Sequence, residues 1–358
     1  MKPLSIVWRR WARQGYYGSL ARRSRFRSSF DPPVAAGEFA SRISSRESVL
    51  SEGVLCVTLI LGCISSVTRR SMGSSQRQTT VVVVKMTIQK AFHRNGQLRE
   101  LVPLRKGRRH GMVRVWHKNG LLASEEPYQN GLLHGVCRQW SEAGRLLGKY
   151  RMVHGTGIQR TWHENGRLQL EFSTVRGDFS GRYRLWLHDG ALISEEINLH
   201  GRPVTAEEYR SARAKDKSLP KLTGEAGKPL PNTVATEKHI HEVFVRSLLA
   251  QRNRAKARKW LESGGKAVRS LGRFKRESAA LKFVESLYRA GTPEVIAPDI
   301  YDGKAGDQFA DCLLVKLPKV AARRKAIRKV CAQLSRRELG AIQPDQDLGE
   351  SYLYLSLA

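Results

Sequence analysis

The chain has 358 residues, of which 41% are hydrophobic and 27% are charged, a composition typical of folded domains and not of an acidic disordered protein. The 63 lysines and arginines exceed the 32 acidic residues, so the formal net charge is +31, which favours contact with anionic partners. No apolar stretch reaches the ~18 residues of a membrane-spanning helix. We also find no catalytic or nucleotide-binding motif, and we therefore predict no enzyme, no catalytic residue, no cofactor and no small-molecule substrate.

Residues 1–85 do not have the pattern of a folded domain. They are rich in arginine and serine, and their first acidic residue is Asp31, a composition similar to that of a transit peptide. The apolar stretch 54–64 is too short to span a bilayer. We favour an over-extended gene start, with initiation at Met72 or Met86, or a disordered segment. A targeting or membrane-anchoring segment is the alternative.

The cysteines and histidines indicate neither a disulfide framework nor a metal site. The number of cysteines is odd, and none forms a Cys-x-x-Cys pair or has a histidine at zinc-ligand spacing. We therefore predict a reducing, cytoplasmic compartment. The histidines between residues 110 and 200 recur because the surrounding sequence repeats, so no metal is predicted. The cysteines are Cys56, Cys63, Cys137, Cys312 and Cys331.

An internal repeat of 22–24 residues occupies the middle of the chain. A first glycine, followed two residues later by leucine, occurs at Gly96, Gly120, Gly144, Gly166 and Gly190. A second glycine occurs at Gly111, Gly135, Gly157 and Gly181. Five residues after each second glycine stands a tryptophan: Trp116, Trp140, Trp162 and Trp186.

Each repeat has the pattern of a β-hairpin. Asn95-Gly96 and its equivalents favour two-residue turns, since both residue types tolerate positive φ. The intervening residues alternate as they do in strands, so Arg114 and Trp116 are expected to share a face. A lone hairpin cannot bury enough surface, so we predict that successive hairpins stack into one array over residues 91–210.

These residues resemble the MORN-repeat variant, a family also found in bacterial antitoxin-type repeat proteins. The resemblance covers residues ~95–209. It implies a β-hairpin scaffold for protein contacts, or in some relatives lipid contacts, and it implies no reaction.

A column of arginines accompanies the tryptophans and is the first candidate contact site. These residues could form a ladder for phosphates or an acidic peptide, but Glu125, Glu171 and Glu195 also share one repeat position. We favour cross-strand Arg–Glu pairing over a free ladder. The arginines are Arg114, Arg138, Arg160 and Arg184.

Residues 211–236 contain several prolines and lysines and are predicted to be an exposed linker. Residues 237–358 then follow a helix–strand–strand–helix–strand order, with 268–274 as a first strand, which predicts a small ferredoxin-like α+β sandwich. The densest basic run lies near its start, and we favour its interpretation as a solvated helix face. The alternative makes it the second candidate contact site, for RNA or a membrane surface. This run contains Arg252, Arg254, Lys256, Arg258 and Lys259.

The predicted fold class is therefore β followed by α+β: a MORN-like antiparallel hairpin array and a ferredoxin-like domain. We predict a non-catalytic interaction protein that uses the array as a scaffold for a protein partner, and we do not expect a membrane partner. Nucleic-acid binding through the basic α+β domain is one alternative. Neutralisation of a toxin partner by the repeats is another.

Overall fold

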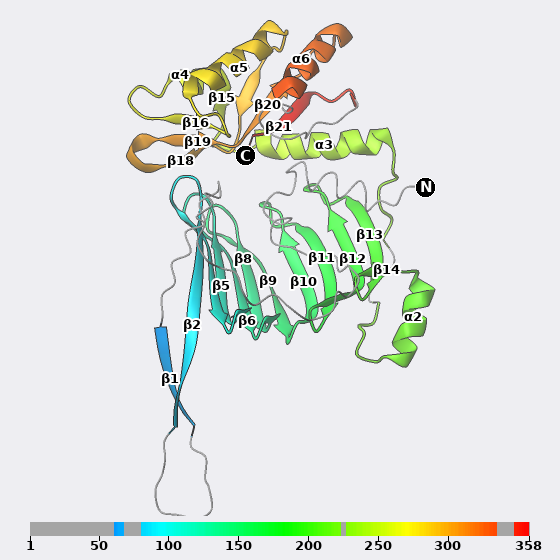
Figure 1. The fold of residues 1–358 in the computed structure, drawn as a ribbon. Helices are drawn as coiled ribbons and strands as arrows, with labels where there is room; N and C mark the ends of the chain where they lie inside the picture. The colour runs from blue at the N-terminus through cyan, green and yellow to red at the C-terminus, as the bar shows by residue number, and fades with distance from the viewer. Residues whose placement is uncertain (1–60, 68–79, 223–226, 335–346, 358) are drawn as a thin grey trace, which may run out of the picture. The chain divides into compact units, whose positions relative to one another are not determined.

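The computed structural model describes residues 61–67, 80–222, 227–334 and 347–357. Most of residues 1–85 lies outside the described residues. The predictions made for that segment, namely its transit-like composition and a start at Met72 or Met86, therefore stay predictions. The described residues all belong to one compact unit. This unit contains a large antiparallel sheet and a smaller α/β region (Figure 1).

The large sheet has 14 strands, and sequential hairpins lie side by side in chain order (Figure 1). The short strands β4 and β7 pair with β3 and β6 beside the main path. This arrangement confirms the predicted hairpin array. The strands are β1 (Leu61–Val67), β2 (Thr80–Phe92), β3 (Leu98–Arg105), β4 (Arg108–Arg109), β5 (Gly111–Trp116), β6 (Leu122–Gln129), β7 (Leu132–Leu133), β8 (Gly135–Trp140), β9 (Leu146–Val153), β10 (Thr156–Trp162), β11 (Leu168–Val175), β12 (Asp178–Trp186), β13 (Leu192–Leu199) and β14 (Arg202–Pro203).

The sheet begins earlier than residue 91, where the array was expected to start. Strand β2 begins at Thr80 and pairs with β3 from Met86↔Arg105 to Phe92↔Leu98, and with β1 on its other side. The β-branched run at residues 81–84 therefore belongs to this strand, as its β propensity favours.

The array ends in helix α2 (Ala206–Lys215), which Thr205 caps by accepting a hydrogen bond from the Glu208 N–H at 3.1 Å. The expectation of an exposed linker from residue 211 is wrong at Leu219, which is only 2% exposed. The buried Tyr209 side chain donates a hydrogen bond to the Pro220 carbonyl, so the chain after α2 folds back against the helix.

The smaller region contains a four-stranded and a three-stranded sheet. Its strands are β15 (Ala255–Lys256), β16 (Arg269–Leu271), β17 (Val295–Ala297), β18 (Tyr301–Asp302), β19 (Gln308–Ala310), β20 (Cys312–Lys316) and β21 (Tyr352–Ser356). Its helices are α3 (Val234–Leu249), α4 (Ala257–Glu262), α5 (Glu277–Arg289), α6 (Ala321–Leu334) and the short 3-10 helix Lys304–Gly306.

The strand order departs from the expected ferredoxin-like layout. The four-stranded sheet has the order β15-β17-β20-β21, and every neighbouring pair is antiparallel. A split β-α-β unit would need another strand between the two strands that a helix connects, yet β20 and β21, connected by α6, are direct neighbours. The predicted first strand forms as β16 but pairs with β19 in the separate three-stranded sheet.

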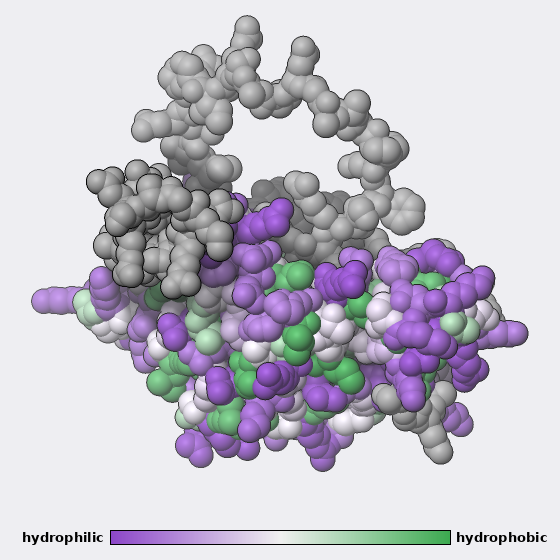
Figure 2. Space-filling view, turned by 90° about the horizontal axis from the view of Figure 1, so that it is seen from below, coloured by the Kyte–Doolittle hydropathy of each residue, from purple (hydrophilic) through white to green (hydrophobic). Residues whose placement is uncertain are grey.

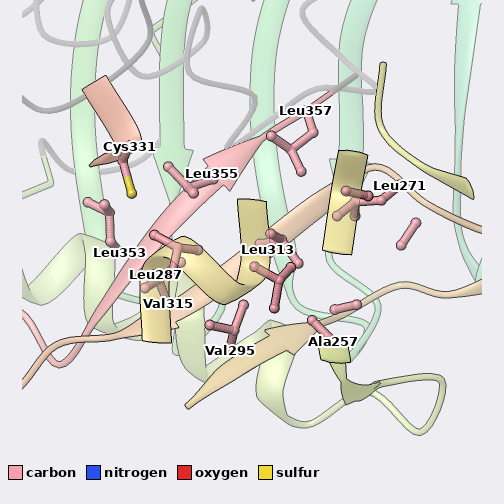
Figure 3. Close-up of a cluster of buried hydrophobic side chains, with 14 of the residues drawn as sticks. Ala257, Leu271, Leu287, Val295, Leu313, Val315, Cys331, Leu353, Leu355 and Leu357 are labelled. Atoms are coloured by element: carbon pink, nitrogen blue, oxygen red, sulfur yellow. The ribbon is translucent and has the colours of Figure 1, made fainter. Parts of the chain in front are cut away.

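Helices cover both faces of the four-stranded sheet. Leu313 and Val315 point into a core shared with α4, α5 and α6, whose side chains converge in Figure 3. Leu314, between them in the strand, packs instead with Val245 of α3. Strict alternation along β20 therefore builds two apolar layers, which is why its residues 312–315 form an unbroken buried run.

Candidate interaction surface

The tight turns of the hairpins lie at the opposite end from the one predicted. A residue with φ near +50° precedes a glycine with positive φ, and one strand pair flanks each dipeptide, for example Arg105↔Arg108 around Lys106-Gly107. This is the signature of a two-residue type I′ turn. The five turns are Lys106-Gly107, Asn130-Gly131, His154-Gly155, Arg176-Gly177 and His200-Gly201.

The Asn-Gly dipeptides at residues 95–96, 119–120 and 165–166 form longer turns, in which only the glycine has positive φ. At the first of them, the His93 N–H donates to the Gln97 carbonyl at 2.8 Å and the Gly96 N–H donates to the His93 carbonyl at 2.9 Å. The asparagine is required for a different reason than the one predicted: its side chain connects neighbouring repeats.

Each of these asparagines donates a hydrogen bond from its side-chain amide to a backbone carbonyl 23 residues later. Histidines two residues before them make a similar contact with the carbonyl of the tryptophan in the next repeat. The pairs are Asn95–Lys118 (2.8 Å), Asn119–Glu142 (2.7 Å), Asn165–His188 (2.8 Å), His93–Trp116 (2.9 Å), His117–Trp140 (3.0 Å) and His163–Trp186 (3.0 Å). These contacts hold successive hairpins at a fixed spacing.

This role accounts for two of the histidines between residues 110 and 200, His117 and His163, and for His93 before them. Within the residues that the structure describes, His, Cys, Asp and Glu side chains form no group of three that could bind a metal ion. One repeat has Ser141 in place of the histidine, and there the Gln139 amide donates to the Trp162 carbonyl at 3.0 Å. The same carbonyl position is thus satisfied by a different residue.

The array is expected to lose stability as the pH falls. Burial lowers the pKa of His163 to about 4, although its hydrogen bond to the Trp186 carbonyl opposes the shift. The unfolded chain, with an ordinary pKa of about 6.5, takes up the proton first. The contribution of His163 is therefore fully present above about pH 6.5 and is lost as the pH falls toward 4.

Thermal unfolding between pH 7.5 and pH 4 measures this dependence. The His163→Gln variant, which keeps a side-chain amide for the Trp186 carbonyl, should show a smaller fall in Tm over that range. Equal falls in the variant and the original protein would contradict the prediction.

The tryptophans do not follow the simple alternation expected of them. A register shift lies directly before each tryptophan, for example between Val115 and Trp116. Because the shift interrupts the strict alternation of side chains, the two-residue spacing does not show that the arginine and the tryptophan share a face. The indole of Trp162 lies against Gly148, where a Cβ would come within 2.3 Å of the ring. Gly148 and Lys149 are adjacent in β9 and point to opposite faces, so the indole packs on the face that Lys149 does not occupy.

The arginine column is paired with glutamates, as the favoured interpretation expected. The register places Arg114 opposite Glu125, Arg160 opposite Glu171 and Arg184 opposite Glu195. Their nitrogen–oxygen distances are 2.8, 2.8 and 3.1 Å. Arg138 lies 3.9 Å from Glu125, a looser contact with a carboxylate that Arg114 already engages. The side chains of Arg114, Arg138 and Arg160 remain 37–44% exposed, so this face of the sheet is open to solvent.

The second candidate site is less concentrated than its sequence suggests. Arg258 lies 3.3 Å from Glu285 and 4.5 Å from the centre of the Tyr288 ring. Lys256 lies 3.8 Å from Glu294, and Arg254 donates to the Gln251 carbonyl. Arg252 and Lys259 are exposed. Strand β15 and helix α4 divide the basic run, so its residues do not share one helix face.

A charged cluster that the sequence did not predict joins the array to the α/β region. Lys118, in a turn of the array, lies 2.8 Å from Asp299 and 3.0 Å from Asp311. Its ammonium also lies 4.3 Å from the centre of the Tyr301 ring. Burial disfavours the charged ammonium, but the two carboxylates raise the pKa of Lys118 above its ordinary value. Lys118 is more than 180 residues away from these partners, so no local pattern could have revealed the cluster.

A second unpredicted cluster lies behind α6. Glu350 is 1% exposed and accepts hydrogen bonds from Arg324 and Arg328 and from the Leu348 N–H. Asp347 pairs with both arginines, and its hydrogen bond with Arg324 lowers the pKa of Asp347. Of these two arginines of helix α6, Arg324 is buried and Arg328 is half-buried against the segment before β21.

Comparison with known proteins identifies one of the hairpins. Residues 109–130, from β4 to the end of β6, match the family model of the MORN repeat variant. No curated protein and no solved structure matches the chain. MORN repeats are generally repeats for interaction with proteins or membranes, and the family is typically non-enzymatic.

None of the helices in the described residues combines the length and the apolar character that crossing a membrane requires.

Proposed function

We propose that this protein is a non-catalytic, cytoplasmic interaction protein whose MORN-variant array binds a protein partner. The observation that carries the proposal is the open face of the array. Three arginines of one column stay 37–44% exposed while the sheet holds them in a regular row. Fixed spacing and solvent access are what a scaffold needs to recognise an extended partner surface.

The polar character of the array favours a protein partner over a lipid surface. Arg–Glu pairs alternate across neighbouring strands, and alternating charges fix the register of a partner more than they increase raw affinity. In the view of Figure 2, hydrophobic residues form small groups among hydrophilic ones. Such a surface is typical of a selective protein interface, which combines polar contacts with limited apolar area.

A pull-down from native lysate with the full chain tests the proposal, with and without nuclease and at two salt concentrations. We expect a discrete protein partner that survives nuclease treatment. Nucleic acid recovered at low salt and lost at high salt would instead support binding through the basic α/β region, because phosphate contacts depend steeply on salt. A captured partner that is a toxin would specify an antitoxin-type role.

A further inference from the structure

The glutamate column of the array is interrupted at one repeat. Glu125, Glu171 and Glu195 occupy equivalent positions, but the corresponding residue of strand β9 is Lys149. The register places Lys149 directly opposite Arg138, so two like charges face each other across β8 and β9. Such a pair destabilises a sheet, whereas every other arginine of the column has a carboxylate opposite it in its own hairpin.

The sheet itself is weakened at the same place. Strands β9 and β10 pair only through Thr156↔Val153 and Gly157↔Met152. Continuing that register would place Lys149 beside Arg160, but these two residues are not paired. The equivalent pairs at two neighbouring junctions, Glu125↔Arg138 and Glu171↔Arg184, are both formed. The ladder is therefore interrupted where three cations would meet on adjacent strands.

The cations at this interruption are accessible. Lys149 and Arg151 are exposed, and neither forms an ion pair within the described residues. Arg138, 41% exposed, has only its 3.9 Å contact with Glu125. Lys149 and Arg151 are two residues apart on one strand, so they share a face and lie about 7 Å apart. Arg151 continues the cluster along the strand.

We propose that this cationic break, formed by Arg138, Lys149 and Arg151, binds an extended acidic segment of the protein partner. The inference rests on the proposed function and names the part of the array that carries it. Carboxylates at alternate positions of the segment match the spacing of Lys149 and Arg151 and supply the negative charge that the glutamate column lacks here.

The flanking residues favour an acidic peptide over nucleic acid. Glu125 lies opposite Arg138 on one side of the cationic break, and on the other side Glu171 lies one strand beyond the break, opposite Arg160. A phosphate backbone that crosses the array would pass over these carboxylates, whereas a peptide that runs along β9 avoids them. The geometry therefore selects a short acidic strand.

Fluorescence anisotropy with the full chain tests the inference. The probe is a fluorescein-labelled peptide that alternates glutamate and threonine. We expect the wild type to bind it and Lys149→Glu to weaken binding by about tenfold or more, since the variant completes the glutamate column. Lys221→Glu, the same charge change at an exposed site outside the array strands, should leave binding within about twofold.

Thermal unfolding provides a second readout that a simple loss of charge would not give. Lys149→Glu should raise the Tm, because the new carboxylate would pair with Arg138. A lowered Tm, equal weakening by both variants, or no peptide binding by the wild type would each overturn the inference. Tighter binding of single-stranded DNA than of the peptide, with the same dependence on Lys149, would overturn it as well.

The same pull-down separates this inference from the proposed function. If the wild type and Lys149→Glu capture one partner equally, the scaffold function stands and the cationic break is not the contact site. If only the wild type captures it, both proposals are supported. If neither captures a protein, the proposed function itself is wrong.

Discussion

Replacing Glu350 with glutamine is expected to lower the free energy of unfolding by about 3 kcal/mol. The Glu350 carboxylate is 1% exposed and contacts Arg324 and Arg328, and Arg324 is itself 9% exposed. Removing the charge leaves two guanidinium groups, which are largely withdrawn from water, to share the Asp347 carboxylate. Breaking a buried ion pair from one side is costly because the remaining charge cannot be solvated.

Chemical denaturation monitored by circular dichroism measures this effect. Asp347→Asn is the matched control, because it removes one carboxylate from the same two arginines at a side chain that is 38% exposed. We expect the control to cost about 1 kcal/mol. If both variants lowered the free energy of unfolding by the same amount, the burial of Glu350 would not determine how much this cluster stabilises the fold.

Replacing Gly155 with alanine is expected to cost about 3 kcal/mol, through two effects that add. Gly155 has φ +73°, which alanine adopts only with strain. A Cβ there would also lie 2.6 Å from the Gly177 backbone nitrogen, which donates a hydrogen bond to the Gly155 carbonyl. Because the obstacle is the backbone of the next repeat, the clash cannot be relieved by rotating a side chain.

The array supplies its own control for this variant. Gly107 occupies the same position in the first of these turns, with φ +73°, and a Cβ there would have no atom within 4 Å. Gly107→Ala should therefore lower the free energy of unfolding only through the strain of positive φ at alanine, by about 1 kcal/mol. The difference between the two variants in denaturant unfolding measures how tightly neighbouring repeats pack. No difference would mean that the repeats do not pack closely at this end.

The periodic positions of the array could be predicted from the sequence because each repeat faces the same local constraints. Glycines such as Gly131 and Gly155 are needed where the backbone has positive φ, and Arg114 and Glu125 meet because two residues opposite each other in a hairpin share a face. The pairing of the arginine column followed from register alone. The assignment of the tight turns to Asn95-Gly96 and its equivalents was wrong, since the sequence does not show that the Asn95 side chain is used between repeats.

The ferredoxin-like prediction failed for a related reason. The order of helices and strands was close to the observed order, but strand order in a sheet depends on long-range pairing that local patterns do not encode. The segment around Leu271 has strand character in either arrangement, and only its parallel pairing with β19 places it in the second sheet.

Local patterns in the sequence were enough to predict the hairpin repeat, its length, its arginine and glutamate columns and the approximate positions of most strands and helices. These features depend on periodicity and on backbone preferences, which act over a few residues. The contacts of Lys118 with Asp299 and Asp311, the burial of Glu350 and the interruption of the sheet beside Lys149 became visible only in the folded chain. Each of these depends on which charges are brought together and removed from water, and that is set by packing between segments far apart in the chain.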